Sequence, residues 1–150
     1  MNFEQVFGKA KWIGYEDPER FCAIRDRFTV KAGEKAEITV LGFGRFVLYV
    51  NSKRVHKELF LPLNSNFESV GRNCENPAEV MDVRCYPCVF DLTPFICEGE
   101  NVICLLLGGG WYVGTKISAS QGPYGTPKAC YSIRIGNDVG ERYHYSDENH

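Results

Sequence analysis

The sequence predicts an all-β fold, a sandwich or a barrel, built as a single domain. Apolar and polar residues alternate along many short segments, which is the pattern of half-buried strands. Turn residues rich in glycine, asparagine and proline separate these segments, as they do in antiparallel β-domains. The chain has 150 residues, which is the size of one domain with a substantial hydrophobic core.

Seven segments carry this alternation, and each is interpreted as one strand. They span residues 21–30, 35–41, 45–50, 86–92, 101–107, 129–135 and 142–145. Asn51-Ser52 follows the third segment, and the charged return 53–55 indicates a β-hairpin, although serine suits the second turn position less well than glycine. The residues 136–138 (Gly-Asn-Asp) mark the turn before the last strand.

Segment 101–107 differs from the others because both of its faces are apolar. Val102, Cys104 and Leu106 alternate with Ile103, Leu105 and Leu107. A strand that is apolar on both faces has to be covered on both faces. We therefore expect a central strand whose outer side meets either the long connection 56–84 or another domain.

The connection 56–84 is long enough to have a function or a local structure of its own. Asn76, Pro77 and Glu79 occur in the order of a helix cap, a first helical position and a capping-box acid. One helical turn is therefore predicted within the connection.

Charge and composition exclude several classes of protein. The net charge is −2 and basic residues are scattered among acidic ones, so no nucleic-acid-binding patch is expected. The longest apolar run, near residues 102–107, is too short to cross a membrane. The N-terminus resembles no signal peptide, no Asn-x-Ser/Thr site occurs, and the cysteine count of seven is odd. We expect a cytoplasmic protein with free thiols.

Two motifs imitate known sites without the surroundings those sites require. Residues 109–116 have the glycine spacing of a P-loop, but Thr115 precedes Lys116 and residues 118–127 predict turns rather than a helix. Cys85 and Cys88 have redox or zinc spacing, yet an extended segment points them to opposite faces, and a second zinc-binding pair is missing. We expect packed, free cysteines and no metal site.

Catalytic patterns are also absent from the sequence. His56, His144 and His150 lie apart, near turns or the chain end, and they match no hydrolase motif. Most carboxylates are interpreted as surface charges, with Asp91 as an exception treated below. We expect no catalytic residue in this chain.

The segment 105–114, LLLGGGWYVG, is the most distinctive in the chain. Glycines such as Gly109 and Gly110 let a backbone bend sharply or approach a second surface closely. Trp111 and Tyr112 offer flat apolar faces and polar edges. Two alternatives follow: the rings plug the end of the sandwich, or they face a ligand or a partner.

Three stretches together resemble the N-terminal domain of bacterial α-L-rhamnosidases. They are LGFGRFVLYVNSKRV (41–55), YPCVFDLTP (86–94) and GENVICLLLGGGWY (99–112). The family pattern is a strand ending in Asn-Gly-x-x-Val, then Tyr-Asp-Val-Thr, then Gly-x-Asn and a strand closing on Gly-Asn-Gly-Trp-Tyr. The resemblance covers about residues 11–147, with a longer middle loop in this chain.

The resemblance implies a jelly-roll β-sandwich of the galactose-binding-like type. It also implies a non-catalytic accessory module of a multidomain glycoside hydrolase, in which a separate (α/α)6 barrel carries out catalysis. That barrel is longer than the whole chain. We therefore expect residues 1–150 to form one module of a longer polypeptide, which docks on its sister domains and helps to frame the sugar site.

Departures from the family pattern affect the sugar-binding residues. Some family members bind rhamnose through calcium, but Gly109 replaces the asparagine between the glycines and so removes an oxygen ligand. Residues 62–65 (Pro-Leu-Asn-Ser) replace Pro-Gly-Trp-Thr and remove a stacking ring, while Asn51-Ser52 replaces Asn-Gly. Asp91 and Thr93 match the family's Asp and Thr, and we expect them to hydrogen-bond the turn into Pro94.

An autonomous carbohydrate-binding module for rhamnose-containing glycans is the main alternative. It would stack sugar on Trp111 or Tyr112, with Asn51, Asn64 and Asp91 as polar partners, and calcium is the one cofactor it would use. A sandwich of the β-galactosidase lineage shares the fold but lacks the Gly-Trp-Tyr ending.

Overall fold

The computed structural model describes residues 3–15, 22–59, 61–62, 85–113 and 124–148, and for Trp111 and Val113 it describes the backbone alone. The helical turn predicted at residues 76–79 and the candidate residue Asn64 lie outside the described residues.

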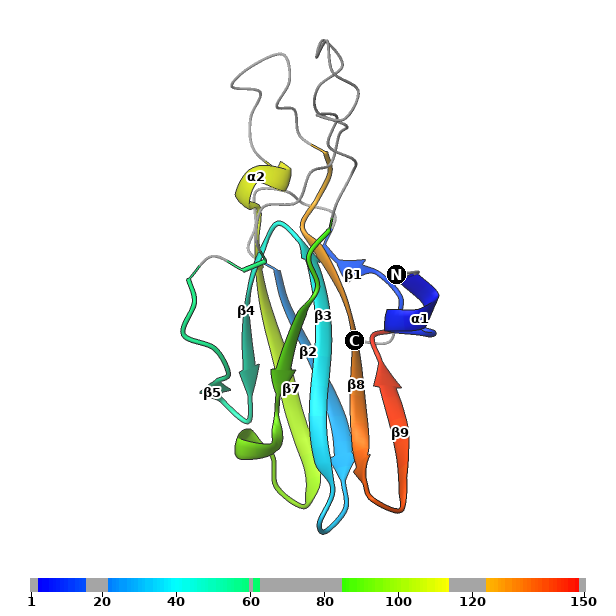
Figure 1. Cartoon of the computed structure of the whole chain (residues 1–150). Helices are drawn as coiled ribbons and strands as arrows, with labels where there is room; N and C mark the ends of the chain where they lie inside the picture. The colour runs from blue at the N-terminus through cyan, green and yellow to red at the C-terminus, as the bar shows by residue number, and fades with distance from the viewer. Residues whose placement is uncertain (1–2, 16–21, 60, 63–84, 114–123, 149–150) are drawn as a thin grey trace, which may run out of the picture.

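Two antiparallel sheets pack face to face and form a β-sandwich (Figure 1). The first sheet contains β1 (Ile13–Gly14), β8 (Lys128–Asn137), β3 (Lys35–Phe43) and β6 (Cys88–Asp91) in that order, and β9 (Gly140–Tyr145) also pairs with β8. The second sheet contains β2 (Cys22–Val30), β7 (Gly99–Gly108), β4 (Arg45–Val50) and β5 (Lys53–Arg54) in that order. The prediction of an all-β jelly-roll sandwich is confirmed.

The core lies between the two sheets and consists of the alternate residues that the sequence pattern places on one face of each strand. Ile24, Phe28 and Val30 of β2 are buried there, as are Ile103, Leu105 and Leu107 of β7. Ile38 and Val40 of β3 face Ile133 and Tyr131 of β8 across the first sheet. Burial of these apolar side chains supplies the main favourable free energy of folding.

The observed strands follow the predicted ones with small changes at their ends. β4 has the predicted bounds, β3 extends to Phe43, and β6 is shorter than the predicted segment 86–92. Asn51 and Ser52 have φ angles of 48° and 64°, which are the paired left-handed conformations of a tight hairpin turn. Serine therefore occupies the position that usually favours glycine.

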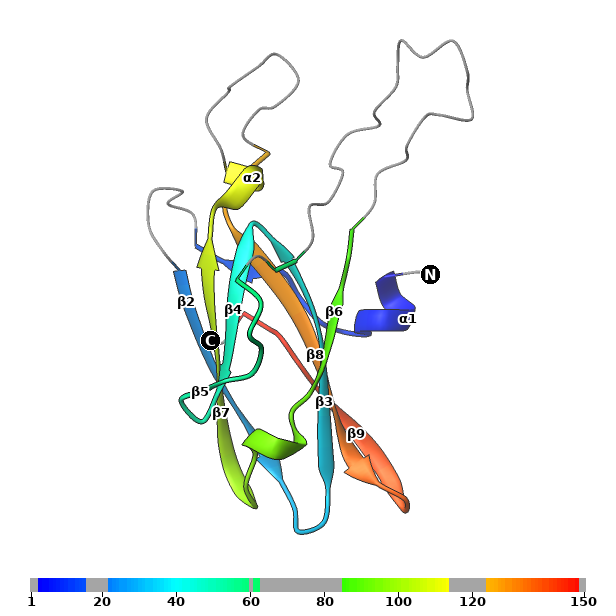
Figure 2. The same cartoon turned by 60° about the vertical axis from the view of Figure 1, so that its left-hand side comes forward.

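Three short helical segments complete the described chain: α1 (Phe3–Phe7), the 3-10 turn η2 (Thr93–Phe95) and α2 (Gly110–Val113). The α1 helix lies against the outer face of the first sheet (Figure 2), where Phe7 and Ala10 join Leu41 and Cys130 in a second apolar cluster. None of these segments was predicted, because three to five residues are too few to show helical periodicity. No helix among the described residues has the length and apolarity needed to span a membrane.

The strand β7 is central, as predicted. It pairs with β2 along one edge and with β4 along the other. Its inner face is buried, and Leu106 on its outer face is 40% exposed. The described residues therefore leave part of this apolar outer face open.

Candidate functional site

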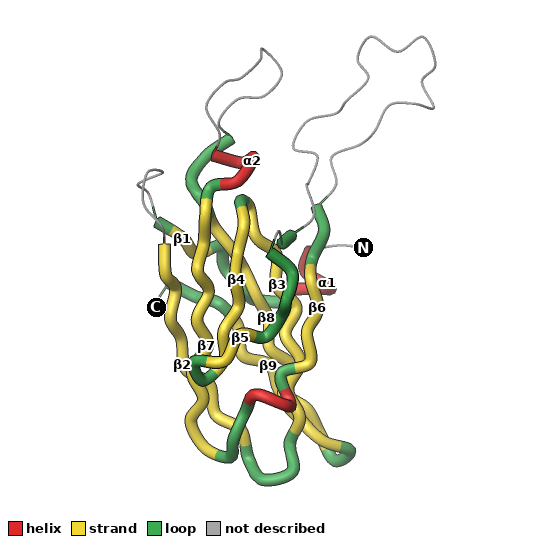
Figure 3. Tube along the Cα trace, turned by 90° about the vertical axis from the view of Figure 1, so that its left-hand side faces the viewer, coloured by secondary structure: helices red, strands yellow, loops and turns green. Residues whose placement is uncertain are grey.

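The candidate residues lie at two opposite ends of the sandwich. In the pairing of β4 with β7, Arg45 faces Gly108 at one end and Val50 faces Ile103 at the other. Gly109, Gly110 and Tyr112 follow the first of these ends, whereas Asn51 follows the second. Figure 3 shows the corresponding separation of α2 from η2, the turn that follows Asp91. The structure thus does not bring the described candidates together in one site.

Asn51 uses its side-chain amide within the chain. Its Nδ2 donates to Asn101 Oδ1 at 2.8 Å and to the carbonyl oxygen of Phe95 at 3.0 Å. Its Oδ1 accepts the N–H of Val102 at 3.0 Å. Both amide hydrogens are therefore committed to holding the hairpin end together, which leaves Asn51 little capacity to donate to a ligand.

Asp91 shapes the turn into Pro94, as expected. Its Oδ1 accepts the N–H of Thr93 at 2.9 Å, and Thr93 Oγ1 accepts the N–H of Ala36 at 3.4 Å. Hydrogen bonds from the Thr93 hydroxyl and backbone hold the pKa of Asp91 below its usual value. The carboxylate is exposed and ionised at neutral pH.

Tyr112 is packed inside the glycine-rich end. It is only 7% exposed, and its ring stacks on Phe43 at 5.1 Å and on Tyr124 at 6.0 Å between centroids. Phe43 stacks in turn on Trp12 at 4.3 Å, and the Lys128 ammonium lies over both of those rings. Of the two alternatives for the paired rings, packing is the one that Tyr112 adopts. The Trp111 side chain is not among the described atoms.

The glycines of this end allow two backbones to approach closely. Gly44, with φ of 106°, lies where a β-carbon would meet the carbonyl oxygen of Gly108 at 2.4 Å. Gly110 has φ of 51°, and a β-carbon there would meet Arg45 Cγ at 2.9 Å. The turn between β3 and β4 and the end of β7 thus require glycine for contact with each other.

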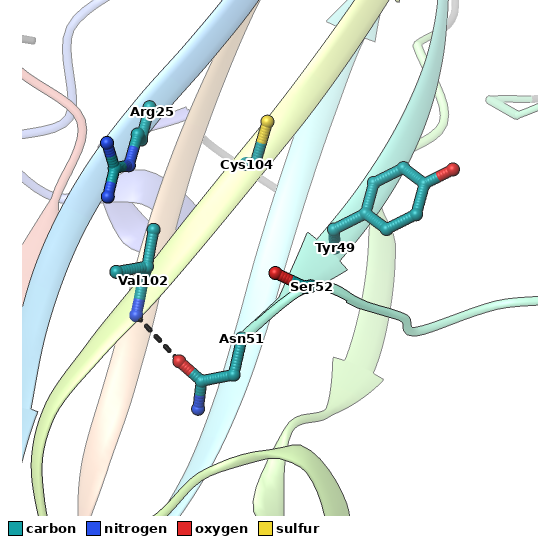
Figure 4. A pocket seen from close by; sticks show the side chains of 6 residues that line it. All are labelled: Arg25, Tyr49, Asn51, Ser52, Val102 and Cys104. Atoms are coloured by element: carbon teal, nitrogen blue, oxygen red, sulfur yellow. Dashed lines mark hydrogen bonds between the residues drawn. The ribbon is translucent and has the colours of Figure 1, made fainter.

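An open groove crosses the outer face of the second sheet. Its volume is about 620 Å³, and Arg25, Tyr49, Asn51, Ser52, Val102 and Cys104 line it (Figure 4). Strand register places Cys104 directly between Arg25 of β2 and Tyr49 of β4. The groove therefore has an apolar floor on β7, a cationic side chain on one side and an aromatic ring on the other.

The two arginines on the outer face of β2 differ in their partners. Arg27 forms an ion pair with Glu100, with 3.2 Å between Nη1 and Oε1. For Arg25 the described residues provide no carboxylate within ion-pair distance, and its side chain is exposed. Within the part of the chain that the structure describes, the positive charge of Arg25 in the groove thus has no carboxylate partner and faces solvent.

One carboxylate was misassigned from the sequence. Asp26 was interpreted as a surface charge, but its side chain is only 10% exposed, and it accepts hydrogen bonds from His144 Nε2 and, at 2.6 Å, from the Tyr131 hydroxyl. Burial favours a higher pKa for Asp26, but the hydrogen bonds from His144, Tyr131 and the Arg27 N–H outweigh it and hold the pKa below its usual value. The sequence does contain a signal for its burial, because Asp26 alternates with Ile24 and Phe28 on the face of β2 that points into the core.

A second missed residue is His56, which is buried rather than placed in a solvated turn. Its Nε2 accepts the N–H of Leu48 at 3.2 Å, so its Nδ1 carries the hydrogen and donates to the carbonyl oxygen of Glu58 at 3.0 Å. Burial lowers the pKa of His56, and the nearby Arg54 charge adds to this effect. The neutral ring therefore acts as a structural link between β4 and the chain that follows β5.

Sequence comparison assigns the chain to a protein family. The sequence profile described as "Alpha-L-rhamnosidase N-terminal domain" matches residues 31–148, which is most of the chain. The chain belongs to the family of α-L-rhamnosidase N-terminal domains. A relative named α-L-rhamnosidase from Formosa agariphila is 25% identical over 126 residues, a match that covers 79% of this chain and 12% of the relative.

Solved structures of α-L-rhamnosidases contain the same fold as this rhamnosidase N-terminal domain. The enzyme from Dictyoglomus thermophilum superposes with a TM-score of 0.72 at 22% identity, covering 93% of this chain and 16% of the enzyme. The Aspergillus terreus enzyme superposes with a TM-score of 0.72 at 20% sequence identity, and the match covers 98% of this chain and 17% of the enzyme. For the Streptomyces avermitilis enzyme in complex with L-rhamnose the TM-score is 0.65 at 17% identity, and the match covers 83% of this chain and 11% of the enzyme. The chain thus spans about one sixth or less of these relatives.

The Gly-x-Asn motif of this rhamnosidase N-terminal domain has a clear structural role. Asn101 is fully buried, and its Nδ2 donates to the carbonyl oxygens of Cys97 and Gly99 at 2.8 and 3.0 Å. Its Oδ1 accepts from Asn51 Nδ2 and from the N–H of Cys97, both at 2.8 Å. The motif therefore closes the turn that leads into β7.

Six cysteines of the rhamnosidase N-terminal domain lie in the described ranges, and none of these six is in a disulfide. Cys88 contacts the core between the sheets, Cys85 contacts the second cluster on the outer face of the first sheet, and Cys97 is exposed. The prediction that Cys85 and Cys88 point to opposite faces is confirmed. Within the described ranges, no three His, Cys, Asp or Glu side chains gather in a way that could hold a metal ion.

Proposed function

We propose that this chain is a non-catalytic accessory domain of an α-L-rhamnosidase-type glycoside hydrolase, and that it docks on other domains of its parent polypeptide. Family membership supports this proposal, as does the small share of each relative's length that the chain spans. A module of this size in a longer protein normally packs on its neighbours through part of its surface.

The observation that carries the docking proposal is the contrast between the two outer faces of the sandwich. The N-terminal segment covers the outer face of the first sheet through Phe7 and Trp12. On the outer face of the second sheet, strand register aligns Ala23, Leu106 and Val47 in one row, and Leu106 is 40% exposed. An apolar row of this kind favours contact with another protein surface.

The row borders the glycine-rich end of the sandwich, where the backbones of Gly44 and Gly108 approach each other closely. A partner domain seated on Leu106 would therefore also reach this end, and the end would help to frame a sugar site formed by the partner domain.

The test uses the complete polypeptide that carries this domain. Leu106→Glu should separate the unfolding of this domain from that of its neighbours, because a buried interface would then contain an unpaired charge. Calorimetry should show one coupled transition in the wild type and an additional, lower transition in the variant. Val139→Glu is the matched control, because Val139 is 95% exposed in the turn between β8 and β9.

Two results would reject the proposal. One is hydrolysis of an aryl α-L-rhamnoside by the 150-residue chain alone, since a non-catalytic domain should show none. The other is identical unfolding of the Leu106→Glu and Val139→Glu polypeptides. A change in KM of the complete enzyme after Leu106→Glu would support a role in framing the sugar site.

The alternative function is that of an autonomous carbohydrate-binding module, and the open groove on the second sheet favours it. The glycine-rich end is a poorer place for a sugar to stack, because the Tyr112 ring is covered by Phe43 and Tyr124. Titration of the chain with L-rhamnose, with and without calcium, tests this alternative. If millimolar L-rhamnose produced neither heat nor a spectral change, rhamnose would be excluded as the ligand.

A further inference from the structure

We propose that the groove on the outer face of the second sheet binds a saccharide that carries a carboxylate, and that Arg25 is the residue that recognises the carboxylate. The inference does not depend on docking, because the groove begins one row further along the sheet than the apolar row around Leu106. It also concerns a different surface from the glycine-rich end.

The shape of the groove suits one sugar ring. Arg25, Cys104 and Tyr49 form a single row across β2, β7 and β4. Neighbouring strands lie about 4.8 Å apart, so the two outer residues of this row are separated by about 10 Å at their backbones. Figure 4 shows the side chains of Arg25 and Tyr49 on the two sides of the Cys104 and Val102 floor. The volume of about 620 Å³ lies within the range of small-molecule sites.

The charge of the groove favours an anion. Glu100, the carboxylate opposite Thr29 on the same face, is occupied by Arg27. Arg54 lies beside Tyr49 in the next strand and uses Nη2 to donate to the carbonyl oxygen of Glu58 at 2.8 Å. A carboxylate above Arg25 would thus meet a positive field, and a guanidinium binds a carboxylate through two parallel hydrogen bonds.

The remaining lining favours a sugar over a bare anion. Val102 and Cys104 form an apolar floor on which the C–H face of a pyranose can lie, and Tyr49 provides an aromatic wall with a hydroxyl group. Ser52 holds its hydroxyl at the rim of the groove on the hairpin turn. A uronate combines the three features that this lining matches: a carboxylate, an apolar ring face and hydroxyl groups.

The experiment is a titration of the chain with sodium glucuronate at constant ionic strength, followed by amide and arginine side-chain NMR signals. We expect shifts at Arg25, Tyr49 and Cys104 that saturate at millimolar concentration. Glucose has the ring without the carboxylate, and acetate has the carboxylate without the ring, so both should shift these signals far less.

Variants separate the role of Arg25 from that of general surface charge. Arg25→Gln should weaken glucuronate binding by about tenfold or more, as expected for the loss of a charge-assisted contact. Arg27→Gln is the matched control, since Arg27 lies on the same strand and face but is paired with Glu100. It should leave the affinity within about twofold.

A second readout tests the location directly. Glucuronate should slow the reaction of Cys104 with N-ethylmaleimide, while exposed Cys97 should react at an unchanged rate. Equal shifts with acetate and glucuronate would overturn the saccharide assignment and leave a simple carboxylate site, such as one for a protein side chain. The inference as a whole would be overturned if glucuronate caused no shift at tens of millimolar, if Arg25→Gln and Arg27→Gln bound equally, or if Cys104 were not protected.

Discussion

Asn51 Nδ2 donates a hydrogen bond of 2.8 Å to Asn101 Oδ1, and this contact ties the end of β4 to the start of β7. The two residues are 50 positions apart in the sequence. Asn101 also holds the turn formed by Cys97 and Gly99, so a single buried amide connects two adjacent strands and the turn that leads into β7. Asn51, which the sugar-binding hypothesis names as a polar partner of the ligand, thus has a structural task together with Asn101.

Asn101→Ala should destabilise the domain by about 3 kcal/mol, because it leaves buried backbone groups without partners. Asn137→Ala is the control, since Asn137 makes one exposed contact with the N–H of Val139 and should cost less than about 1 kcal/mol. Urea unfolding of both variants provides the comparison. Equal midpoints for the two variants would contradict the structural role of Asn101.

Asp26→Asn should destabilise the domain at neutral pH by about 1–3 kcal/mol, because the Tyr131 hydroxyl and His144 lose an ionised acceptor. The pKa of Asp26 is lowered in the folded state, so this stabilisation is present above the unfolded value of about 3.9 and is lost as pH falls through the folded value. The difference in stability between the wild type and Asp26→Asn should therefore shrink in acid. Asp138→Asn, in the exposed β8–β9 turn, should show no such convergence.

The domain should be less stable in mild acid than at neutral pH because of His56. Its pKa is lowered in the folded state by burial, so the unfolded chain takes up a proton first as pH falls below about 6.5. The contribution of neutral His56 is therefore complete above that pH and declines below it. His56→Gln keeps an acceptor for the Leu48 N–H but does not titrate, so its urea midpoint should change less between pH 7.5 and 5. Parallel pH dependence in the two proteins would rule this out.

Gly44→Ala should be among the most damaging single substitutions in the chain. A β-carbon there would lie 2.4 Å from the carbonyl oxygen of Gly108, and φ is 106°. We expect a loss above about 3 kcal/mol, or failure to fold. Gly33→Ala separates the two causes, because Gly33 has φ of 75° but open space around it, and should cost about 1–2 kcal/mol. Thermal unfolding of both variants measures the difference; equal losses would mean that the close backbone approach is unimportant.

The strands and the core could be predicted because their signal is local. Ile24, Phe28 and Val30 are two or four positions apart, and the pleat of a strand places such residues on one face whatever the rest of the chain does. The central position of β7 followed from the same rule applied to both of its faces. The bounds of α1 and α2 could not be predicted, because contacts with the sheet rather than periodicity support such short helices.

The sites depended on which strands become neighbours. Asp26 was misinterpreted because its partners, Tyr131 and His144, are 105 and 118 positions away, and no local pattern connects them. Tyr112 could have faced solvent or the core, and Phe43 and Tyr124 decided in favour of the core. The groove exists because register aligns Arg25, Cys104 and Tyr49 from three different strands.

The amino-acid sequence alone determined that this chain has an all-β fold, where most of its strands run, and that it resembles the rhamnosidase N-terminal domains, which are sandwiches. The tertiary structure decided which polar groups meet, which ring is covered and where an arginine faces an open groove. The physical reason is that side-chain alternation is set residue by residue, whereas cross-strand partners are set by topology and register.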